Sequence, residues 1–393
     1  MQISKNKSMS VASEKGNKFG LNTIFKSKMT TILIATAAIW VLFTFLTDGN
    51  FLTTRNLSNL FRQMSITGVL AIGMVFVIIL GEIDLSAGST LGLLGGIAAI
   101  LNVWLGFSAI PTVVITLILG VIMGAWNGYW IAFRNVPSFI VTLASMLVFR
   151  GILIGITGGN TVAPLTPDFK AIGQAYLPTA FGYVLVVLAV AGAAYLILNN
   201  RKNKLKYNIE VKPMGVDIAT IVGIGVVSLG LVLILNDYQG FPIPAFIMLV
   251  LALILGFVGT KTIFGRRVYG IGGNRDAARL SGINVKKHII VVYSVLGLLC
   301  AVAGILLTTR LNAGSVSAGQ NAEMDAIASC VIGGASLAGG SGTVVGALVG
   351  ALVMASIDNG MSMMNTPTFW QYIVKGFILL IAVWMDISSK NKK

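Results

Sequence analysis

Long apolar runs recur along this chain, and they restrict its fold more than any other feature of the sequence. An α-helix rises about 1.5 Å per residue, so about 20 apolar residues cross the ~30 Å hydrocarbon core of a bilayer. Only 10% of the 393 residues are charged, whereas soluble domains carry about 25%. The sequence therefore predicts an all-α polytopic membrane protein with about 10–12 transmembrane helices. It excludes a soluble enzyme and a disulfide-rich secreted domain.

Short polar segments separate the predicted spans, and two of these spans differ from the others. Residues 326–338 and 342–357 are short and rich in glycine, so a broken helix or a re-entrant pair is an alternative to two crossings. The predicted spans are 30–47, 64–81, 85–107, 112–133, 138–157, 178–198, 216–235, 243–260, 288–308, 326–338, 342–357 and 371–385.

The positions of the Lys and Arg residues predict the orientation of the chain. They are concentrated in an N-terminal tail (1–28), in the loops 199–215 and 261–287, and in a C-terminal tail (387–393). Because cytoplasmic segments carry an excess of Lys and Arg, we expect both tails and both loops to be cytoplasmic. The net charge of +15 thus indicates topology and no binding of nucleic acid. The segments predicted on the other side carry only Arg55, Arg62, Lys170 and Arg310.

Residues 29–386 are predicted to form one transmembrane domain. The longest segment between spans, 261–287, is shorter than the ~40 residues at which independent domains begin. The first apolar run follows a basic tail and has no clear cleavage site, so we expect it to be retained as a span. Any energy-converting module is then expected on another subunit, unless an ion gradient drives the protein.

The residues needed for catalysis or metal binding are scarce. His288 is the only histidine, and both cysteines, Cys300 and Cys330, fall inside apolar runs. The dipeptide Gly-Lys is absent, so the chain has no P-loop for ATP phosphates. We therefore expect no catalytic residue, no metal site and no cofactor bound by this chain.

The loop 261–287 contains a candidate docking element. Asn274 is a typical N-cap residue, and the residues 276–281 after it predict a helix of about two turns that Gly282 ends. A short capped helix between two spans suits a lever that docks into a partner. The alternative is a solvated loop helix without a partner.

The same loop carries a family resemblance. The pattern Asp276-Ala277-Ala278-x-x-x-Gly282 resembles the Glu-Ala-Ala-x-x-x-Gly loop of permeases from ATP-binding-cassette (ABC) importers, with Asp in place of Glu. From about residue 30 to 386 the chain resembles the sugar permeases of the ribose/xylose group. The two spans that flank the basic loop 199–215 are similar to those of the xylose branch. Further matching stretches are GEIDLSAGS at 81–89, VPSFIVTL at 136–143, NGMSMM at 359–364 and PTFWQYIVKG at 367–376.

The resemblance implies a permease of the cytoplasmic (inner) membrane that carries a monosaccharide, with D-xylose as the expected sugar. It also implies a homodimer of the permease, an ABC subunit that holds ATP and Mg and performs the hydrolysis, and an extracytoplasmic sugar-binding protein. Residues expected to couple the permease to the ATPase are Asn274, Asp276, Ala277, Ala278, Arg279, Ser281, Gly282 and Ile283.

Three alternatives remain open at this point. One is a permease for another pentose or hexose, such as a ribose-like sugar. Another is an ion-coupled secondary sugar transporter, which would need carboxylates buried within spans, whereas the 13 acidic residues are expected almost wholly at span ends or in loops. The third, an integral-membrane enzyme, would need clustered His, Asp and Glu residues.

Four polar residues are candidates for the translocation pathway: Glu82, Asp84, Ser86 and Arg150. Ionisable groups between apolar runs are costly and so point to function. Capping of the following helix by Asp84 or Ser86 is the competing interpretation. Lys375, near one end of the last span, is expected to snorkel to the membrane surface.

Glycines and aromatic residues supply two further expectations. The spacing Gly342-x3-Gly346-x3-Gly350 predicts close helix packing, and Gly88-x3-Gly92 repeats it weakly. Aromatic rings near span ends form an interfacial belt, although any of them could also stack on a sugar. The rings considered are Trp104, Trp126, Tyr129, Trp130, Trp370 and Tyr372.

Overall fold

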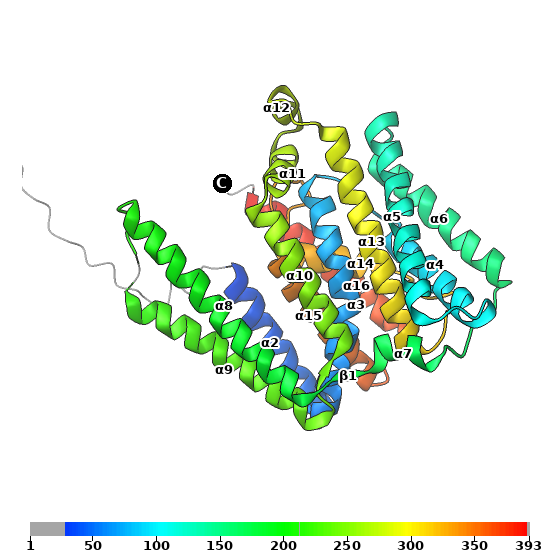
Figure 1. Cartoon of the computed structure of the whole chain (residues 1–393), viewed down its shortest axis with the longest axis horizontal. Helices are drawn as coiled ribbons and strands as arrows, with labels where there is room; N and C mark the ends of the chain where they lie inside the picture. The colour runs from blue at the N-terminus through cyan, green and yellow to red at the C-terminus, as the bar shows by residue number, and fades with distance from the viewer. Residues whose placement is uncertain (1–27, 212, 391–393) are drawn as a thin grey trace, which may run out of the picture.

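The computed structural model describes residues 28–211 and 213–390, which form an almost wholly helical bundle (Figure 1). Ten of the described helices are long and apolar enough to cross a membrane. The prediction of an all-α polytopic membrane protein is therefore confirmed. The predicted N-terminal tail lies outside the described residues except for Lys28, and the C-terminal tail is described as far as Lys390.

The elements follow one another in this order: α2 (Lys28–Leu46), η1 (Asn50–Leu52), α3 (Thr54–Ile79), α4 (Ala87–Ala99), η2 (Ile100–Trp104), α5 (Ala109–Arg134), α6 (Ser138–Thr157), α7 (Pro167–Gln174), β1 (Tyr176–Leu177), α8 (Thr179–Lys206), α9 (Met214–Tyr238), β2 (Phe241–Pro242), α10 (Ile243–Lys261), α11 (Ile263–Gly273), α12 (Arg275–Leu280), α13 (Val285–Leu311), α14 (Ala322–Ile332), α15 (Val344–Met363) and α16 (Thr368–Lys390).

The bundle has two ends. One end, called the α12 face, carries α11, α12 and the turns 80–86 and 333–343 (Figure 1). The opposite end, called the ribbon face, carries η1, α7 and the two-stranded ribbon formed by β1 and β2. The basic loop 261–287 lies at the α12 face, as the positive-inside rule requires of a cytoplasmic side. The cytoplasmic position of this face stays a prediction. The basic residues at or near the ribbon face are Arg55, Arg62, Lys170 and Arg310.

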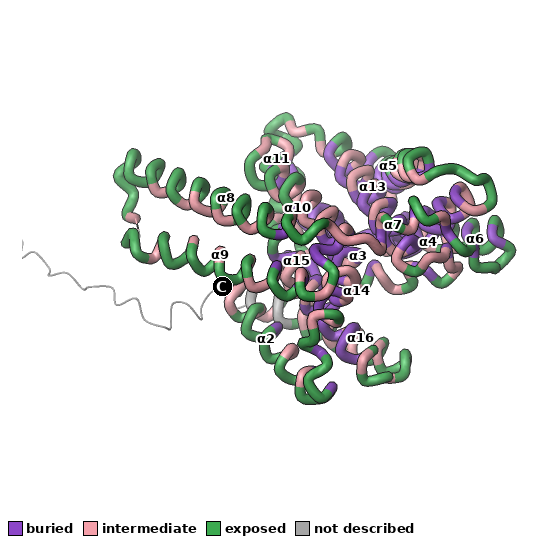
Figure 2. Tube along the Cα trace, turned by 60° about the horizontal axis from the view of Figure 1, so that its bottom comes forward, coloured by how far each residue is buried: buried purple, intermediate pink, exposed green. Residues whose placement is uncertain are grey.

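The helices α3 and α13 form the centre of the bundle. Most of α3 is buried, including an unbroken run from Gly68 to Ile79, and α13 is buried along one side against α3, α4 and α5 (Figure 2). Leu70, Ile72 and Tyr293 are fully enclosed. The outer helices instead expose large apolar side chains, which suits contact with lipid.

The helices α8 and α9 form a hairpin that leaves the body of the bundle (Figure 1). It joins the body at the ribbon face through a small cluster that includes Val232, Leu235 and Phe241. At its far end Arg201 Nη1 lies 2.7 Å from Asp217 Oδ2. The first part of the basic loop, 199–206, belongs to the last turns of α8, because that helix continues to Lys206.

The glycine-rich spans near the C-terminus are unequal. The helix α14 has 11 residues and is about 16 Å long, too short to cross a bilayer. By contrast, α15 has 20 residues and extends to Met363. The expectation that 342–357 is short is therefore wrong, while the span predicted at 326–338 is a short helix preceded by the irregular stretch 312–321.

Two spans are interrupted, and they meet near the middle of the bundle. Gly304, which packs against the backbone of Leu91, lies about 28 Å along α13, a helix about 40 Å long. The helix α4 starts four residues before Leu91, on the side of the α12 face, so its start lies near mid-depth. The irregular turn 80–86 connects the end of α3 at the α12 face to this start. Gly319 packs on the backbone of Gly88, so α14 begins at the same depth and runs toward the α12 face.

The expected glycine packing is confirmed between α14 and α15. A Cβ on Gly346 would meet the backbone of Gly333, and a Cβ on Gly350 would meet the backbone of Ser329. Glycine at these positions lets the two helix backbones approach closely. The helices α14 and α15 thus present the turn 333–343 between them to the end of α3, where Gly340 N donates to Ile79 O over 2.9 Å.

Replacing Gly350 with Val should destabilise the bundle. The added side chain would collide with the Ser329 backbone, which cannot rotate away. Overpacking costs about 1–3 kcal/mol or more, so we expect a Tm lowered by about 5 °C in detergent. Thermal unfolding checks this, with Gly230→Val on α9 as the control, because a Cβ there meets nothing within 4 Å. Equal Tm values for the two variants would contradict the packing described here.

Candidate functional site

The loop 261–287 is built from two helices. Thr262 Oγ1 accepts from Gly265 N over 3.2 Å and starts α11. Asn274 Oδ1 accepts from Ala277 N over 2.9 Å and starts α12, so the predicted N-cap is confirmed. Gly282 ends α12 with a φ of +80°, a left-handed conformation that favours glycine. The helix predicted at 276–281 is observed at Arg275–Leu280.

One side of α12 is attached to the bundle and the other is exposed. Ala278 is buried, and Ile283 packs against the core. Arg275 Nη1 lies 2.9 Å from Glu82 Oε1 in the turn 80–86. The exposed side ends in Leu280, which is 85% exposed and which sequence reasoning missed. The residues exposed on and beside α12 are Asn274, Arg275, Asp276, Ala277, Arg279, Leu280, Ser281 and Gly282.

The helix α11 connects α12 to the interrupted spans. Tyr269 Oη donates to Gly342 O over 2.6 Å. Burial raises the pKa of the Tyr269 hydroxyl, which keeps it protonated as a donor. Gly272 packs on the backbone of Ile79 and Gly340. Displacement of α12 would therefore reach the end of α3 and the α14–α15 turn through α11.

The predicted pathway residues Asp84 and Ser86 belong to one buried network. Asp84 Oδ1 accepts from the backbone N and the hydroxyl of Ser86, both over 2.7 Å. Ser86 Oγ accepts from Asn127 Nδ2 over 2.9 Å, and Asn127 Oδ1 accepts from Ser145 Oγ over 2.7 Å. The network holds the turn before α4 against α5 and α6. Glu82 lies apart from it and pairs with Arg275.

The fourth pathway candidate, Arg150, holds the irregular stretch 312–321. Arg150 Nη1 donates to Val316 O over 2.6 Å and to Ala318 O over 3.0 Å. Backbone carbonyls at this depth need such donors because no lipid group can supply them. Glu323, buried in the first turn of α14, is the acidic residue near this guanidinium. Sequence reasoning missed Glu323.

Lys375 does not snorkel, and that expectation is wrong. Its Nζ lies 2.9 Å from Asp325 Oδ2 on α14 and 2.9 Å from Asp358 Oδ1 on α15. The side chains of all three residues are less than a fifth exposed. The cluster joins α16 to α14 and α15. The expectation that the acidic residues lie almost wholly at span ends or in loops is also wrong, because Asp325, Asp358 and Glu323 lie within helices of the bundle.

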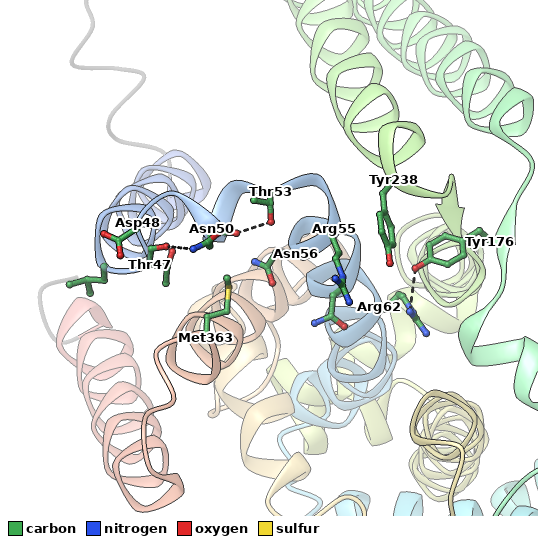
Figure 3. A pocket seen from close by; sticks show the side chains of 12 residues that line it. Thr47, Asp48, Asn50, Thr53, Arg55, Asn56, Arg62, Tyr176, Tyr238 and Met363 are labelled. Carbon is green, nitrogen blue, oxygen red and sulfur yellow. Dashed lines mark hydrogen bonds between the residues drawn. The ribbon is translucent and has the colours of Figure 1, made fainter.

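A cavity of about 780 Å³ opens at the ribbon face (Figure 3). Side chains from the end of α2, from η1, from α3 and from the ribbon region converge on it, and most are polar. The rings of Tyr176 and Tyr238 lie edge to face with centroids 6.1 Å apart. The lining residues are Leu46, Thr47, Asp48, Asn50, Thr53, Arg55, Asn56, Asn59, Arg62, Tyr176, Tyr238 and Met363.

Arg62 organises one wall of this cavity. Its Nη1 donates to Tyr176 Oη over 3.2 Å and its Nη2 donates to Gly173 O over 3.0 Å. Its guanidinium carbon lies 5.6 Å from the Tyr176 ring centre, in cation–π range. Amides, hydroxyls and guanidinium groups around aromatic rings can bind a polyhydroxylated solute. Sequence reasoning missed this site because its residues come from four separate segments.

The structure has long apolar helices around two interrupted spans, an exposed helix at one end and a polar cavity at the other. These features together are typical of a membrane transport protein. Within the described residues, no group of three or more His, Cys, Asp and Glu residues is placed to hold a metal. Residues 56–383 match the family described as the permease component of branched-chain amino acid transport systems, and the chain belongs to this family.

Several similar curated proteins are sugar permeases. The chain is 55% identical to the xylose transport system permease protein XylH of Haemophilus influenzae over 361 residues, which cover 92% of this chain and 96% of that protein. It is 53% identical to XylH of Escherichia coli K12, with 92% of each chain covered. It is 35% identical to the ribose import permease protein RbsC of Bacillus subtilis, with 88% of this chain and 89% of that protein covered. No solved structure gives a significant match.

Lys375→Met should destabilise the contact between α16 and the bundle. It leaves Asp325 and Asp358 buried without their cation, and breaking a buried pair costs about 3–5 kcal/mol. We expect a lower Tm in detergent. The double variant Lys375→Met/Asp358→Asn should regain part of the loss because it removes one of the two unpaired charges. An unchanged Tm for Lys375→Met would show that the cluster does not hold α16.

Proposed function

We propose that this chain is the permease subunit of an ABC importer that carries D-xylose inward across the cytoplasmic membrane. The observation that carries the proposal is the 53–55% identity to xylose permeases over 92% of the chain. The 35% identity to a ribose permease gives the ribose-like alternative weaker support. The chain itself performs no covalent chemistry in this proposal, and a separate ABC subunit binds ATP and Mg and hydrolyses the ATP.

The power stroke enters the permease at α12. In this proposal the α12 face is cytoplasmic, and the exposed residues Asn274 to Ala277 and Arg279 to Gly282 dock into the ATP-binding subunit, while Ala278 and Ile283 anchor α12 to the bundle. The exposed Leu280 supplies an apolar contact, while Asp276 and Arg279 supply charged ones. Closure of the ATPase moves α11 and α12 as a rigid body, and this movement is passed to the end of α3 and to the α14–α15 turn.

The sugar enters at the ribbon face. The cavity there has hydroxyl, amide and guanidinium groups that suit sugar hydroxyls, and Tyr176 and Tyr238 offer ring faces for the sugar C–H groups. An extracytoplasmic sugar-binding protein delivers D-xylose to this cavity. The permease works as a homodimer, so two copies of α12 engage two ATP-binding subunits.

An ion-coupled transporter is the second candidate function. The observation in its favour is the buried cluster of Lys375, Asp325 and Asp358, since ionisable groups inside membranes often mark ion pathways. Lys375 contacts both carboxylates of the cluster and its one positive charge offsets one of their two negative charges. The exposed helix α12 would have no role in an ion-coupled mechanism.

Uptake by reconstituted vesicles tests the two candidates. Vesicles that contain this chain alone should accumulate no D-xylose under a proton or sodium gradient. Uptake should begin when the ATP-binding subunit, its ATP and the external binding protein are all supplied, because the chain has no energy source of its own. Uptake of D-xylose by the chain alone would refute the ABC assignment, and uptake of D-ribose in preference to D-xylose would refute the substrate.

Gly282→Val should uncouple the permease from the ATPase. A β-branched residue is strained at a φ of +80°, so the end of α12 and the position of Ile283 must change. We expect sugar-stimulated ATPase activity to fall by about tenfold or more while membrane insertion is retained. Gly106→Val is the matched control, since Gly106 also has a left-handed φ of +68° and open space around it but lies between α4 and α5. Equal ATPase activity in the two variants would remove α12 from the coupling path.

A further inference from the structure

We propose that the cavity between α14, α15 and α16 binds one monosaccharide ring in transit through the membrane. This inference rests on the proposed function and adds a site to it. The cavity has a volume of about 190 Å³, far above the ~10–15 Å³ that one water molecule needs. It is therefore large enough for a ring-sized polar solute. Its lining residues are Asn321, Met324, Asp325, Ala328, Met354, Tyr372, Lys375, Gly376 and Leu379.

The depth of the cavity fits a transit site. Asn321 and Asp325 belong to the start of α14, which lies near mid-depth because Gly319 packs on Gly88 at the start of α4. In transporters, interrupted helices expose backbone polar groups near the bilayer centre, and substrates bind there. A sugar that leaves the ribbon-face cavity must pass this depth before it reaches the α12 face.

The chemistry of the lining fits a neutral polyol. Lys375 Nζ donates to Asp325 Oδ2 and forms an ion pair with Asp358 Oδ1, each over 2.9 Å, so at least one of its three N–H donors remains for a hydroxyl. In the part of the chain that the structure describes, the Asn321 amide and the Tyr372 hydroxyl have no hydrogen-bond partner. These groups supply both donors and acceptors, as a sugar hydroxyl requires.

The remaining walls suit the apolar face of a sugar ring. Met324, Met354 and Leu379 line the cavity beside the polar groups. The ring of Tyr372 adds an aromatic surface, and stacking of an aromatic ring on a sugar was among the expectations from sequence. The contacts of Lys375 with the Asp325 and Asp358 carboxylates hold these charged groups in fixed positions. A sugar in the cavity would therefore contact donors and acceptors that are already oriented.

Gly376 offers a way to fill the cavity without disturbing the helices. It lines the cavity on α16, and a Cβ there meets nothing within 4 Å. Leu is also a better helix former than Gly. Gly376→Leu should therefore occupy the space of the sugar and leave the fold intact. Gly192→Leu on α8 is the matched control, because Gly192 is a helical glycine in equally open space.

The experiment measures D-xylose uptake and ATP hydrolysis in vesicles that hold the complete importer. We expect Gly376→Leu to lower uptake by about tenfold or more and to leave ATP hydrolysis within about twofold of the wild type. Gly192→Leu should keep both activities. Uptake by the wild-type importer in the same vesicles separates this inference from the proposed function. If the proposed function is wrong, the wild-type importer itself takes up no D-xylose. Wild-type uptake in Gly376→Leu overturns the site.

Two conservative variants test the polar contacts independently, including the case in which Gly376→Leu loses ATPase activity. Tyr372→Phe removes one hydroxyl, and Asn321→Gly removes the amide while keeping the left-handed φ of +62° that glycine tolerates. Each should raise the KM for D-xylose by about three- to tenfold. The controls Tyr195→Phe and Asn365→Gly alter an exposed tyrosine of α8 and a second left-handed asparagine at φ +50°. Unchanged KM values in both test variants overturn the proposal.

Discussion

The meeting of α4 and α14 near mid-depth is the contact on which the rest of this structure depends. Both membrane spans are interrupted there. Inside a bilayer, every backbone N–H or C=O group that a helix leaves unpaired needs a partner from the protein. Arg150 supplies donors to the carbonyls of Val316 and Ala318, and glycines at 88 and 319 let the two backbones touch. The turn before α4 is held by Asp84 and its network. Polar residues inside the membrane are therefore tied to the two interrupted spans.

The same arrangement explains how one end of the bundle can act on its centre. The helix α11 packs against the end of α3 and against the α14–α15 turn, through Tyr269 and Gly272. From that turn α14 leads straight to mid-depth, where the cavity beside Lys375 lies. The proposed path from ATP hydrolysis to sugar therefore consists of rigid helices and close backbone contacts. The α8–α9 hairpin takes no part in this path, since it joins the body only at the ribbon face.

The sequence predicts most of the helices but only some of the residues of the candidate sites. Apolar length fixes which segments cross, and the cap at Asn274 with the turn at Gly282 is a local pattern, so both were predictable. The interruption before α14 was ambiguous, because glycine both breaks helices and packs them. The pairing of Lys375 with Asp325 and Asp358 was missed, since it joins three helices far apart in sequence. The ribbon-face cavity was missed for the same reason.

The central claim is that α12 is a lever on the cytoplasmic side of a permease that has no energy source of its own. Thiol labelling measures this most directly, because the two native cysteines, Cys300 and Cys330, are buried. A cysteine at position 280 should react with a membrane-impermeant maleimide in inverted vesicles and not in right-side-out vesicles. A cysteine at position 48, in the ribbon-face cavity, should show the reverse. Labelling of position 280 from outside the cell would contradict the account.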